Sequence, residues 1–402
     1  MIPELLAPAG AWPQLQAAVR FGADAVYLGG SAYGLRAFAG NFDDEQLPRA
    51  VEYCHSHGVK VYVTLNAFLY DRDVPGIARA AAFVQDAGAD AAIIADPGVA
   101  DILLEAAPHL PMHVSTQANT LNTRAAAFWY RNGARRVILA RELSLEQIRV
   151  MRSDLPSDLE LEAFAHGAVC ASYSGRCVLS NYLTGRDGNQ GECAQTCRWT
   201  YSLMEEKRPG EYMPVYEDER GTTIYSANDL CMIAHLEEMR DAGIASVKIE
   251  GRMKTDYYVA TVVGAYRRAL DGLAEGKVFD PAWEQEAKRA SHRQSGTGFF
   301  FGKPNNPPGS VEYRRNADYC ASVLEVDSSG HALVEQKNKF SVGETLTLLT
   351  PSGAVDFVLD ALWDDESGEA LAAAPHPKQR VRLHLPQGAS PGDFVRRERA
   401  GG

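Results

Sequence analysis

The feature that most constrains the fold is a regular alternation of short apolar runs and amphipathic stretches through the first two thirds of the chain. The apolar runs have the length of buried strands, and they lie at 4–9, 25–30, 60–66, 91–96, 112–117, 136–141, 160–166 and 246–251. Helical periodicity occupies 11–22, 44–57, 74–88, 98–106, 122–132 and 144–152. Eight buried strands with intervening helices predict an α/β fold, a (β/α)8 TIM-like barrel, with a doubly wound sheet as the alternative.

A second, smaller domain is expected after the barrel. Residues 1–290 form the predicted barrel domain, and a long insertion at about 166–227 interrupts it before the last strand. A helix is expected from about 228, and the Gly, Pro and Asn content of 291–310 indicates a linker. From 311 to 402 apolar and polar residues alternate between turn signals, which predicts a small antiparallel β-barrel.

Composition narrows the class of protein. The N-terminal stretch "MIPELLAPAG" lacks the features of a signal peptide, and no apolar run is long enough for a membrane helix, so we expect a cytoplasmic protein without a membrane partner. The net charge of −12 argues against extensive electrostatic binding of nucleic acid but leaves room for a local basic groove. Candidates for such a groove are Arg131, Arg135, Arg136, Arg141, Arg396, Arg397 and Arg399.

Four of the seven cysteines fall in the insertion, with the spacing Cys-x6-Cys-x15-Cys-x3-Cys. The first two intervals between Cys170, Cys177, Cys193 and Cys197 contain glycine, as expected for a loop that wraps closely around a metal centre. Four thiolates suit tetrahedral zinc or an iron–sulfur cluster, and the wide first interval favours a [4Fe-4S] cluster. Cys231 is an alternative fourth ligand, although helix packing also explains it.

The predicted strands end in polar residues, which in a TIM barrel surround the active site. These residues are Asn66, Asp96, Ser115, Gln117, Arg141, Glu162, His166, Lys248, Glu250 and Arg252. Each one has a structural explanation as a cap or loop hydrogen bond, but together they favour an active site at the barrel mouth.

Several motifs resemble one known family. The run "EAFAHGAVCASYSGRCVLS" (162–180) is similar to the signature of the collagenase-like peptidase family of unknown catalytic type, and "RDGNQGECAQTCRW", "SVKIEGRMK" and "SGTGFFFGKP" resemble its further blocks. The resemblance extends over nearly the whole chain. That family includes prephenate-dependent tRNA uridine hydroxylases, a ribosomal-RNA cytidine hydroxylase and oxygen-independent quinone hydroxylases.

The tRNA branch is the most similar, because the "NQGECAQTCRW" segment and the terminal β-barrel suit it. The resemblance implies an iron–sulfur-dependent, oxygen-independent hydroxylase that forms 5-hydroxyuridine at the tRNA wobble position with prephenate as hydroxyl donor. A quinone-branch member takes a later cysteine as ligand, which keeps Cys231 in consideration. Hydroxylation of rRNA or of a quinone is the alternative within the family.

Prephenate carries two carboxylates, and arginine and lysine side chains suit such a small dicarboxylate. The candidates for substrate binding are Arg36, Arg141, Lys248, Glu250 and Arg252, with Glu250 placed to hold neighbouring cations close together. His166, Glu162 and Tyr173 are candidates for catalytic proton transfer near the cluster. His166 also suits a hydrogen bond to a cluster sulfur.

Two other classes of function stay open. The chain has no H-E-x-x-H motif, and its G-x-S-x-G match at 388–392 lies in the predicted terminal β-barrel, outside the strand–turn–helix context of a nucleophile elbow. A peptidase would therefore depend on His166 activating Cys170. A non-catalytic maturation partner would use a metal only to fold its cysteine loop.

Overall fold

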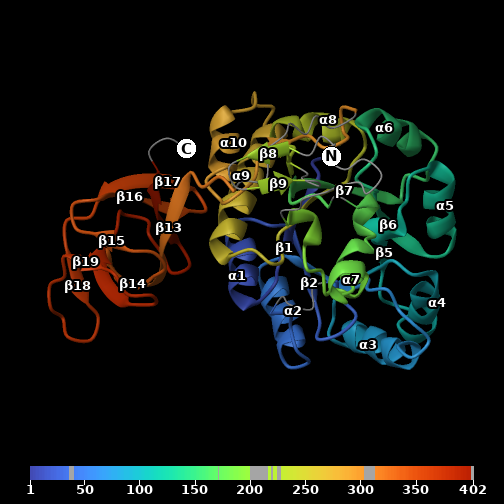
Figure 1. Cartoon of the computed structure of the whole chain (residues 1–402), viewed down its shortest axis with the longest axis horizontal. Helices are drawn as coiled ribbons and strands as arrows, with labels where there is room; N and C mark the ends of the chain where they lie inside the picture. Colours follow the sequence, from blue (N-terminus) through green and yellow to red (C-terminus); the bar gives the residue numbers. More distant parts are fainter. Residues whose placement is uncertain are drawn as a thin grey trace, which may run out of the picture.

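The computed structural model describes residues 1–35, 40–170, 172–199, 216–218, 221–223, 228–302 and 313–399. Figure 1 shows two bodies, a larger α/β barrel and a smaller β domain that lies beside helices α1, α9 and α10. Within the described ranges, no helix combines the length and the apolar character that crossing a bilayer requires.

Eight parallel strands close the barrel, as the alternating pattern predicts. Each strand pairs with the next one in the chain, and the last barrel strand pairs with both the first and the seventh, with Val247 opposite Leu5 on one side and Ala163 on the other. The strands are β1 (Glu4–Pro8), β2 (Ala25–Gly29), β3 (Lys60–Leu65), β4 (Ala91–Ile94), β5 (Met112–Val114), β6 (Ala134–Ile138), β7 (Glu160–Gly167) and β11 (Ser246–Ile249). Their near-continuous burial is typical of parallel strands covered on both faces.

Helices cover the outside of the barrel (Figure 1). They are α1 (Trp12–Arg20), α2 (Gln46–Ser56), α3 (Val74–Asp86), α4 (Pro97–Ala106), α5 (Thr123–Arg131), α6 (Leu145–Ser153), α8 (Leu236–Asp241), α9 (Asp256–Ala274) and α10 (Pro281–Ala287). Local sequence sets their starts: the Ser144 hydroxyl accepts from the backbone N–H of Gln147 and forms a capping box, while Asp96 and Asn122 cap α4 and α5.

The region before the last barrel strand differs from expectation. The helix expected from about 228 begins only at Leu236, and in its place β10 (Asp229–Cys231) pairs antiparallel with β7 and parallel with β12 (Ser295–Gly296). Arg293 is 2% exposed and forms a 2.7 Å ion pair with Asp229. The first part of the expected linker therefore packs on the barrel as an extension of its sheet.

Short elements form the described part of the insertion. They are η2 (Tyr173–Gly175), α7 (Leu179–Thr184), η3 (Gly188–Gln190), η4 (Thr196–Arg198), β8 (Tyr216–Asp218) and β9 (Gly221–Thr223). After the insertion, η5 (Ile233–His235) lies between β10 and α8. In Figure 1, α7 lies in front of the barrel strands.

The C-terminal domain is an antiparallel β structure, as predicted. Its seven-stranded sheet has the order β17-β16-β21-β13-β14-β20-β18, and β15 pairs with β19. The strands are β13 (Ala317–Val326), β14 (His331–Gln336), β15 (Phe340–Ser341), β16 (Thr345–Thr350), β17 (Gly353–Val358), β18 (Leu362–Asp364), β19 (Ala373–Ala374), β20 (Arg380–His384) and β21 (Phe394–Glu398). The domain has its own apolar core, separate from that of the barrel.

Aromatic and ionic contacts attach this domain to the barrel. The rings of Tyr257 and Tyr319 stack with centroids 4.9 Å apart. Arg396 is buried and its Nη1 lies 2.6 Å from Oε1 of Glu286 on α10. These contacts connect β13 and β21 to α9 and α10.

Candidate active site

A cavity of about 370 Å³ opens at the C-terminal ends of the barrel strands. Its walls come from strand residues such as Phe164 and Lys248, from residues just after strand ends such as Asn66 and Arg252, and from the cysteine insertion. This is the position that active sites take in TIM barrels.

All four cysteines of the insertion line this one cavity. None forms a disulfide; Cys193 is exposed, and Cys170, Cys177 and Cys197 are partly buried. Within the described segments, no group of three His, Cys, Asp or Glu side chains is gathered closely enough to hold a single metal ion. The structure therefore brings the four thiols to one wall without packing them around one point.

Backbone hydrogen bonds shape the cysteine loop. The side-chain amide of Asn189 accepts from the backbone N–H of Cys177 at 3.1 Å and donates to its carbonyl at 2.8 Å. The backbone N–H of Gln195 donates to Sγ of Cys193 at 3.3 Å, and a donor of this kind stabilises a thiolate. The hydrogen-bond donor at Cys193 and the cavity that all four cysteines line thus fit ligands of one cluster better than four unrelated thiols.

Cys231 is not among the residues that line the cavity. It is buried on β10 opposite His166, and burial raises the pKa of its thiol to about 11. The expectation that Cys231 could replace Cys197 is therefore not supported, since Cys197 lines the cavity and Cys231 faces the helix side of the sheet beside Tyr266.

Four of the five residues predicted to bind substrate meet at the cavity: Arg141, Lys248, Glu250 and Arg252. The guanidinium of Arg252 donates to Oγ1 of Thr64 at 3.2 Å and to Oδ1 of Asn41 at 2.5 Å. Arg141 donates to the carbonyl of Ala168 at 3.0 Å. Arg36 lies outside the described residues.

The guanidinium of Arg141 also lies 3.9 Å from the ring centroid of Phe164, and its Nη2 is 4.0 Å from Oε2 of Glu250. Stacking and ion pairing hold the planar group in one orientation. Arg141 after β6, Lys248 on β11, and Glu250 and Arg252 after β11 thus form one strongly charged wall of the cavity.

The position expected for Glu162 at the barrel mouth is wrong. Glu162 is the third residue of β7 and is fully buried in the barrel interior, where its carboxylate lies 3.0 Å from both Lys248 Nζ and Arg136 Nη1. Two cations hold this carboxylate below the cavity, so it is placed to position Lys248 rather than to exchange protons with a ligand.

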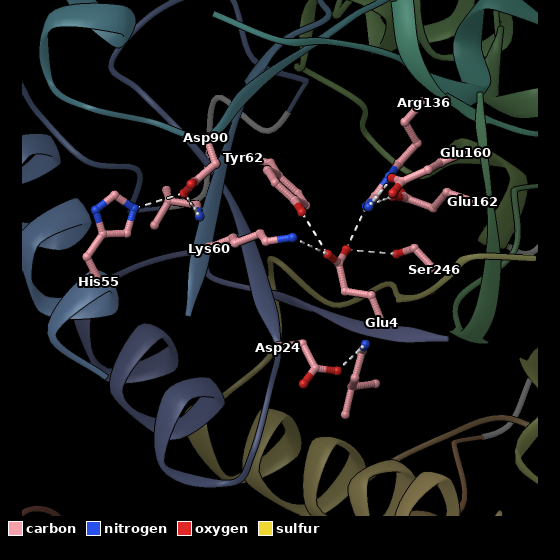
Figure 2. A network of polar contacts seen from close by, with 12 residues as sticks. Glu4, Asp24, His55, Lys60, Tyr62, Asp90, Arg136, Glu160, Glu162 and Ser246 are labelled. Atoms are coloured by element: carbon pink, nitrogen blue, oxygen red, sulfur yellow. Dashed lines mark hydrogen bonds and ion pairs between the residues drawn. The ribbon is translucent and has the colours of Figure 1, made fainter. Parts of the chain in front are cut away.

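Figure 2 shows the rest of this buried network, with Arg136 between the carboxylates of Glu4, Glu160 and Glu162. Tyr62 donates to the second oxygen of Glu4 at 2.8 Å. Burial raises the pKa of Glu4, but its hydrogen bond and ion pair with Arg136 outweigh that effect, and the pKa lies below its ordinary value. Arg136 is therefore a residue of the barrel interior and not part of a basic groove.

His166 also departs from expectation. The pairing of β7 with β11 shifts register after Lys248, where one extra residue of β7 turns His166 to the outer face. Its ring packs on Tyr266 and Tyr258 of α9, with centroids 5.4 and 6.3 Å away. Burial lowers the pKa of His166 to about 4, which keeps the ring neutral at pH 7, and His166 is not among the residues that line the cavity.

Tyr173 lies at the rim of the insertion, 51% exposed, while its neighbours Ser174 and Gly175 line the cavity. The Ser174 backbone and hydroxyl both donate to the carboxylate of Glu142 at 2.6 Å. Burial raises the pKa of Tyr173, and the nearby carboxylate of Glu142 adds to the rise.

The basic cluster expected near the C-terminus is neutralised by acidic partners. Arg397 and Arg399 both pair with Asp318, at 3.0 and 2.7 Å, and Arg396 is the buried partner of Glu286. These arginines stabilise the domain and its attachment to the barrel.

Two amide side chains that follow predicted strands also line the cavity, in addition to the residues predicted to bind substrate or to transfer protons. Asn66 and Gln117 line the cavity with 8% and 5% exposure. A polar residue directly after a buried strand was the available signal. Strand ends alone did not separate these residues from Asp96, which caps a helix.

Comparison with known proteins identifies the family of this chain. The family model described as peptidase family U32 matches residues 10–308, and the model of the U32 C-terminal domain matches residues 315–396. The chain belongs to peptidase family U32. The resemblance found in the sequence motifs is confirmed.

Several U32 relatives have names that state an activity. "tRNA hydroxylation protein P" of Escherichia coli is 37% identical, covering 96% of this chain and 94% of that protein. "tRNA hydroxylation protein P1" of Bacillus subtilis is 38% identical, covering 98% of this chain and 94% of that protein. "23S rRNA 5-hydroxycytidine C2501 synthase" of Escherichia coli is 36% identical, covering 68% of this chain and 40% of that protein.

Proposed function

We propose that this U32 protein is a tRNA-modifying hydroxylase. The observation that carries the proposal is the cavity in which four cysteines face a charged wall of strand-end residues, within a chain that matches two tRNA hydroxylation proteins along almost its whole length. The finer proposal is that the product is 5-hydroxyuridine at the wobble position, which would place the protein in the cytoplasm with its tRNA.

Cys170, Cys177, Cys193 and Cys197 would hold a [4Fe-4S] cluster. When bound, such a cluster supplies redox or Lewis-acid chemistry at the cavity wall. The chain supports it through the Asn189 bridge to the Cys177 backbone and the Gln195 N–H at Cys193.

The charged wall would bind a small dicarboxylate hydroxyl donor, for which we propose prephenate. Arg141 and Arg252 offer oriented guanidinium groups, and Lys248 adds a buried ammonium. Cations of this kind bind carboxylates strongly when water is displaced from a narrow cavity.

The structure does not favour a peptidase. The proposed base His166 lies on the outer face of β7 against α9, whereas Cys170 lines the cavity. A cysteine protease needs the two side chains within hydrogen-bond reach. The similarity to a 23S rRNA hydroxycytidine synthase makes ribosomal RNA the second candidate substrate.

Nucleoside mass spectrometry of total RNA from a strain lacking the gene tests the proposal. We expect a hydroxylated uridine to disappear from tRNA, to return with the wild-type gene, and not to return with Cys177→Ser. Loss of a modified cytidine from ribosomal RNA would move the proposal to the second candidate. An unchanged nucleoside profile in both RNA classes would contradict it.

A further inference from the structure

The cavity has two chemically different walls. Arg141, Lys248, Glu250 and Arg252 form the charged wall described above. The segments after β3 and β5 contribute uncharged polar side chains, namely Asn66, Ser115, Thr116 and Gln117, and Thr64 of β3 joins this wall to the charged one through its hydrogen bond with Arg252. The strand order places β3 and β5 opposite β11, so an occupant of the cavity would touch both kinds of wall.

Ser115 joins the two amides of the neutral wall. Nδ2 of Asn66 donates to Oγ of Ser115 at 3.2 Å, and the same oxygen accepts from the backbone N–H of Gln117 at 3.3 Å. With Nδ2 of Asn66 donating to Ser115, Oδ1 is the atom of this amide that remains to accept a hydrogen bond.

Both amide oxygens lack a partner. Oδ1 of Asn66 and Oε1 of Gln117 are buried and accept no hydrogen bond from any residue in the described part of the chain. Buried polar atoms in native proteins are almost always satisfied, and exceptions often mark a ligand site. A ligand N–H at this wall would satisfy Oδ1 of Asn66, and the Gln117 amide could turn to offer a ligand either its oxygen or its N–H groups.

We propose, resting on the proposed function, that Asn66 and Gln117 form the subsite that binds the Watson–Crick edge of the target uracil. The uracil edge presents an N3–H donor between two carbonyl acceptors. Asn66 Oδ1 accepts from N3–H. The Gln117 amide, whose oxygen has no hydrogen-bond partner among the described residues, turns so that Nε2 donates to one of the two carbonyl oxygens beside N3.

The charges of the two walls assign the two substrates to different places. A dicarboxylate donor would set its anionic oxygens against the unpaired acceptor oxygens of the neutral wall, which is unfavourable. Carboxylates belong on the charged wall, and a neutral base belongs on the amide wall. Cytosine has an acceptor at N3, so the subsite favours uracil.

The test is binding of two anticodon stem-loop RNAs to the cluster-loaded protein. One RNA carries uridine at the target position, and the other carries 3-methyluridine, which lacks the N3–H. We expect the wild type to bind the 3-methyluridine RNA at least about tenfold more weakly, in line with one lost buried hydrogen bond. Asn66→Leu should weaken binding of the uridine RNA by about the same factor and bind both RNAs alike.

Thr116→Val is the matched control. Thr116 lies on the same wall, but its hydroxyl is already used in a 2.9 Å hydrogen bond to the carbonyl of Leu139. This variant should keep the preference for uridine over 3-methyluridine.

Equal binding of both RNAs by the wild type would overturn the subsite, as would a preference that survives in Asn66→Leu. Neither result would touch the proposed function if the wild type still hydroxylates tRNA. Conversely, discrimination by a protein that leaves all RNA unmodified would support the subsite and contradict the proposed hydroxylase.

Discussion

Nζ of Lys248, on the cavity wall, lies 3.0 Å from Oε1 of the fully buried Glu162. The other carboxylate oxygen lies 3.0 Å from Nη1 of Arg136 (Figure 2). The Glu162 carboxylate therefore holds two cations. Burial lowers the pKa of Lys248, and Glu162 opposes that effect. The interior of the barrel is therefore electrostatically coupled to its mouth.

Replacing Glu162 by Gln should destabilise the protein strongly. The change leaves the buried cations Arg136 and Lys248 with less compensating charge, and breaking a buried ion pair from one side costs about 3–5 kcal/mol. Denaturant unfolding of Glu162→Gln at neutral pH measures this free energy.

Glu160→Gln provides the comparison, because Glu160 also contacts Arg136, at 2.6 Å, but its side chain is 48% exposed. An exposed pair contributes about 0–1 kcal/mol, so the loss should be much smaller. Equal losses in the two variants would show that Glu162 has no special role in the network.

The neutral His166 predicts a pH dependence of stability. Its pKa in the folded protein is about 4 because of burial, below the ordinary value of 6.5 expected in the unfolded chain. As the pH falls below about 6.5 the unfolded state takes up a proton that the folded state does not, so stability decreases down to about pH 4. The full contribution is on the order of 3 kcal/mol.

Urea unfolding at pH 7 and pH 5 checks this dependence in the wild type and in His166→Phe, which keeps an aromatic ring against Tyr266. The variant should lose less stability on acidification. Part of the slope should persist, since burial also lowers the pKa of His113. An unchanged slope in the variant would show that His166 does not contribute.

The barrel could be predicted from sequence because its strands are buried on both faces and stand out as apolar runs. Side-chain direction could not be predicted at the end of β7. Period-two alternation places Glu162, Phe164 and His166 on one face, and Glu162 and Phe164 do point inward. His166 points outward because of a register shift that depends on pairing with β11, which lies far along the chain.

The sequence predicts that Cys170, Cys177, Cys193 and Cys197 lie together, because these four residues are close in the chain. The neutral wall was harder to find, since Asn66 and Gln117 come from different strand ends and only the closed barrel brings them to Ser115. The prediction of a helix from about 228 is wrong for a related reason. The segment pairs with β7 and β12, and these tertiary contacts override its local helical pattern.

The positions of the cysteines predict which substitutions remove iron. Cys177→Ser should abolish the cluster, because its thiol lines the cavity with the three other cysteines of the insertion. Cys231→Ser should retain it, because that thiol is buried on β10. Iron content and the visible absorbance of anaerobically purified protein measure both. Loss of iron in Cys231→Ser with retention in Cys197→Ser would reverse the assignment of the fourth ligand.

Gly29, the last residue of β2, should be required for the charged wall. A Cβ at this position would lie 2.2 Å from Nη2 of Arg252, so alanine would displace the guanidinium from Asn41 and from the cavity. Because the clash is with the end of a side chain, the loss of stability should be small. Isothermal titration with prephenate, the proposed donor, should show binding to Gly29→Ala about 10–100-fold weaker than to the wild type, the loss expected for a charge-assisted hydrogen bond. Gly30→Ala is the control, since its Cβ would meet nothing closer than 4.0 Å, and it should bind as the wild type does. Equal binding by both variants would exclude Arg252 from the donor site.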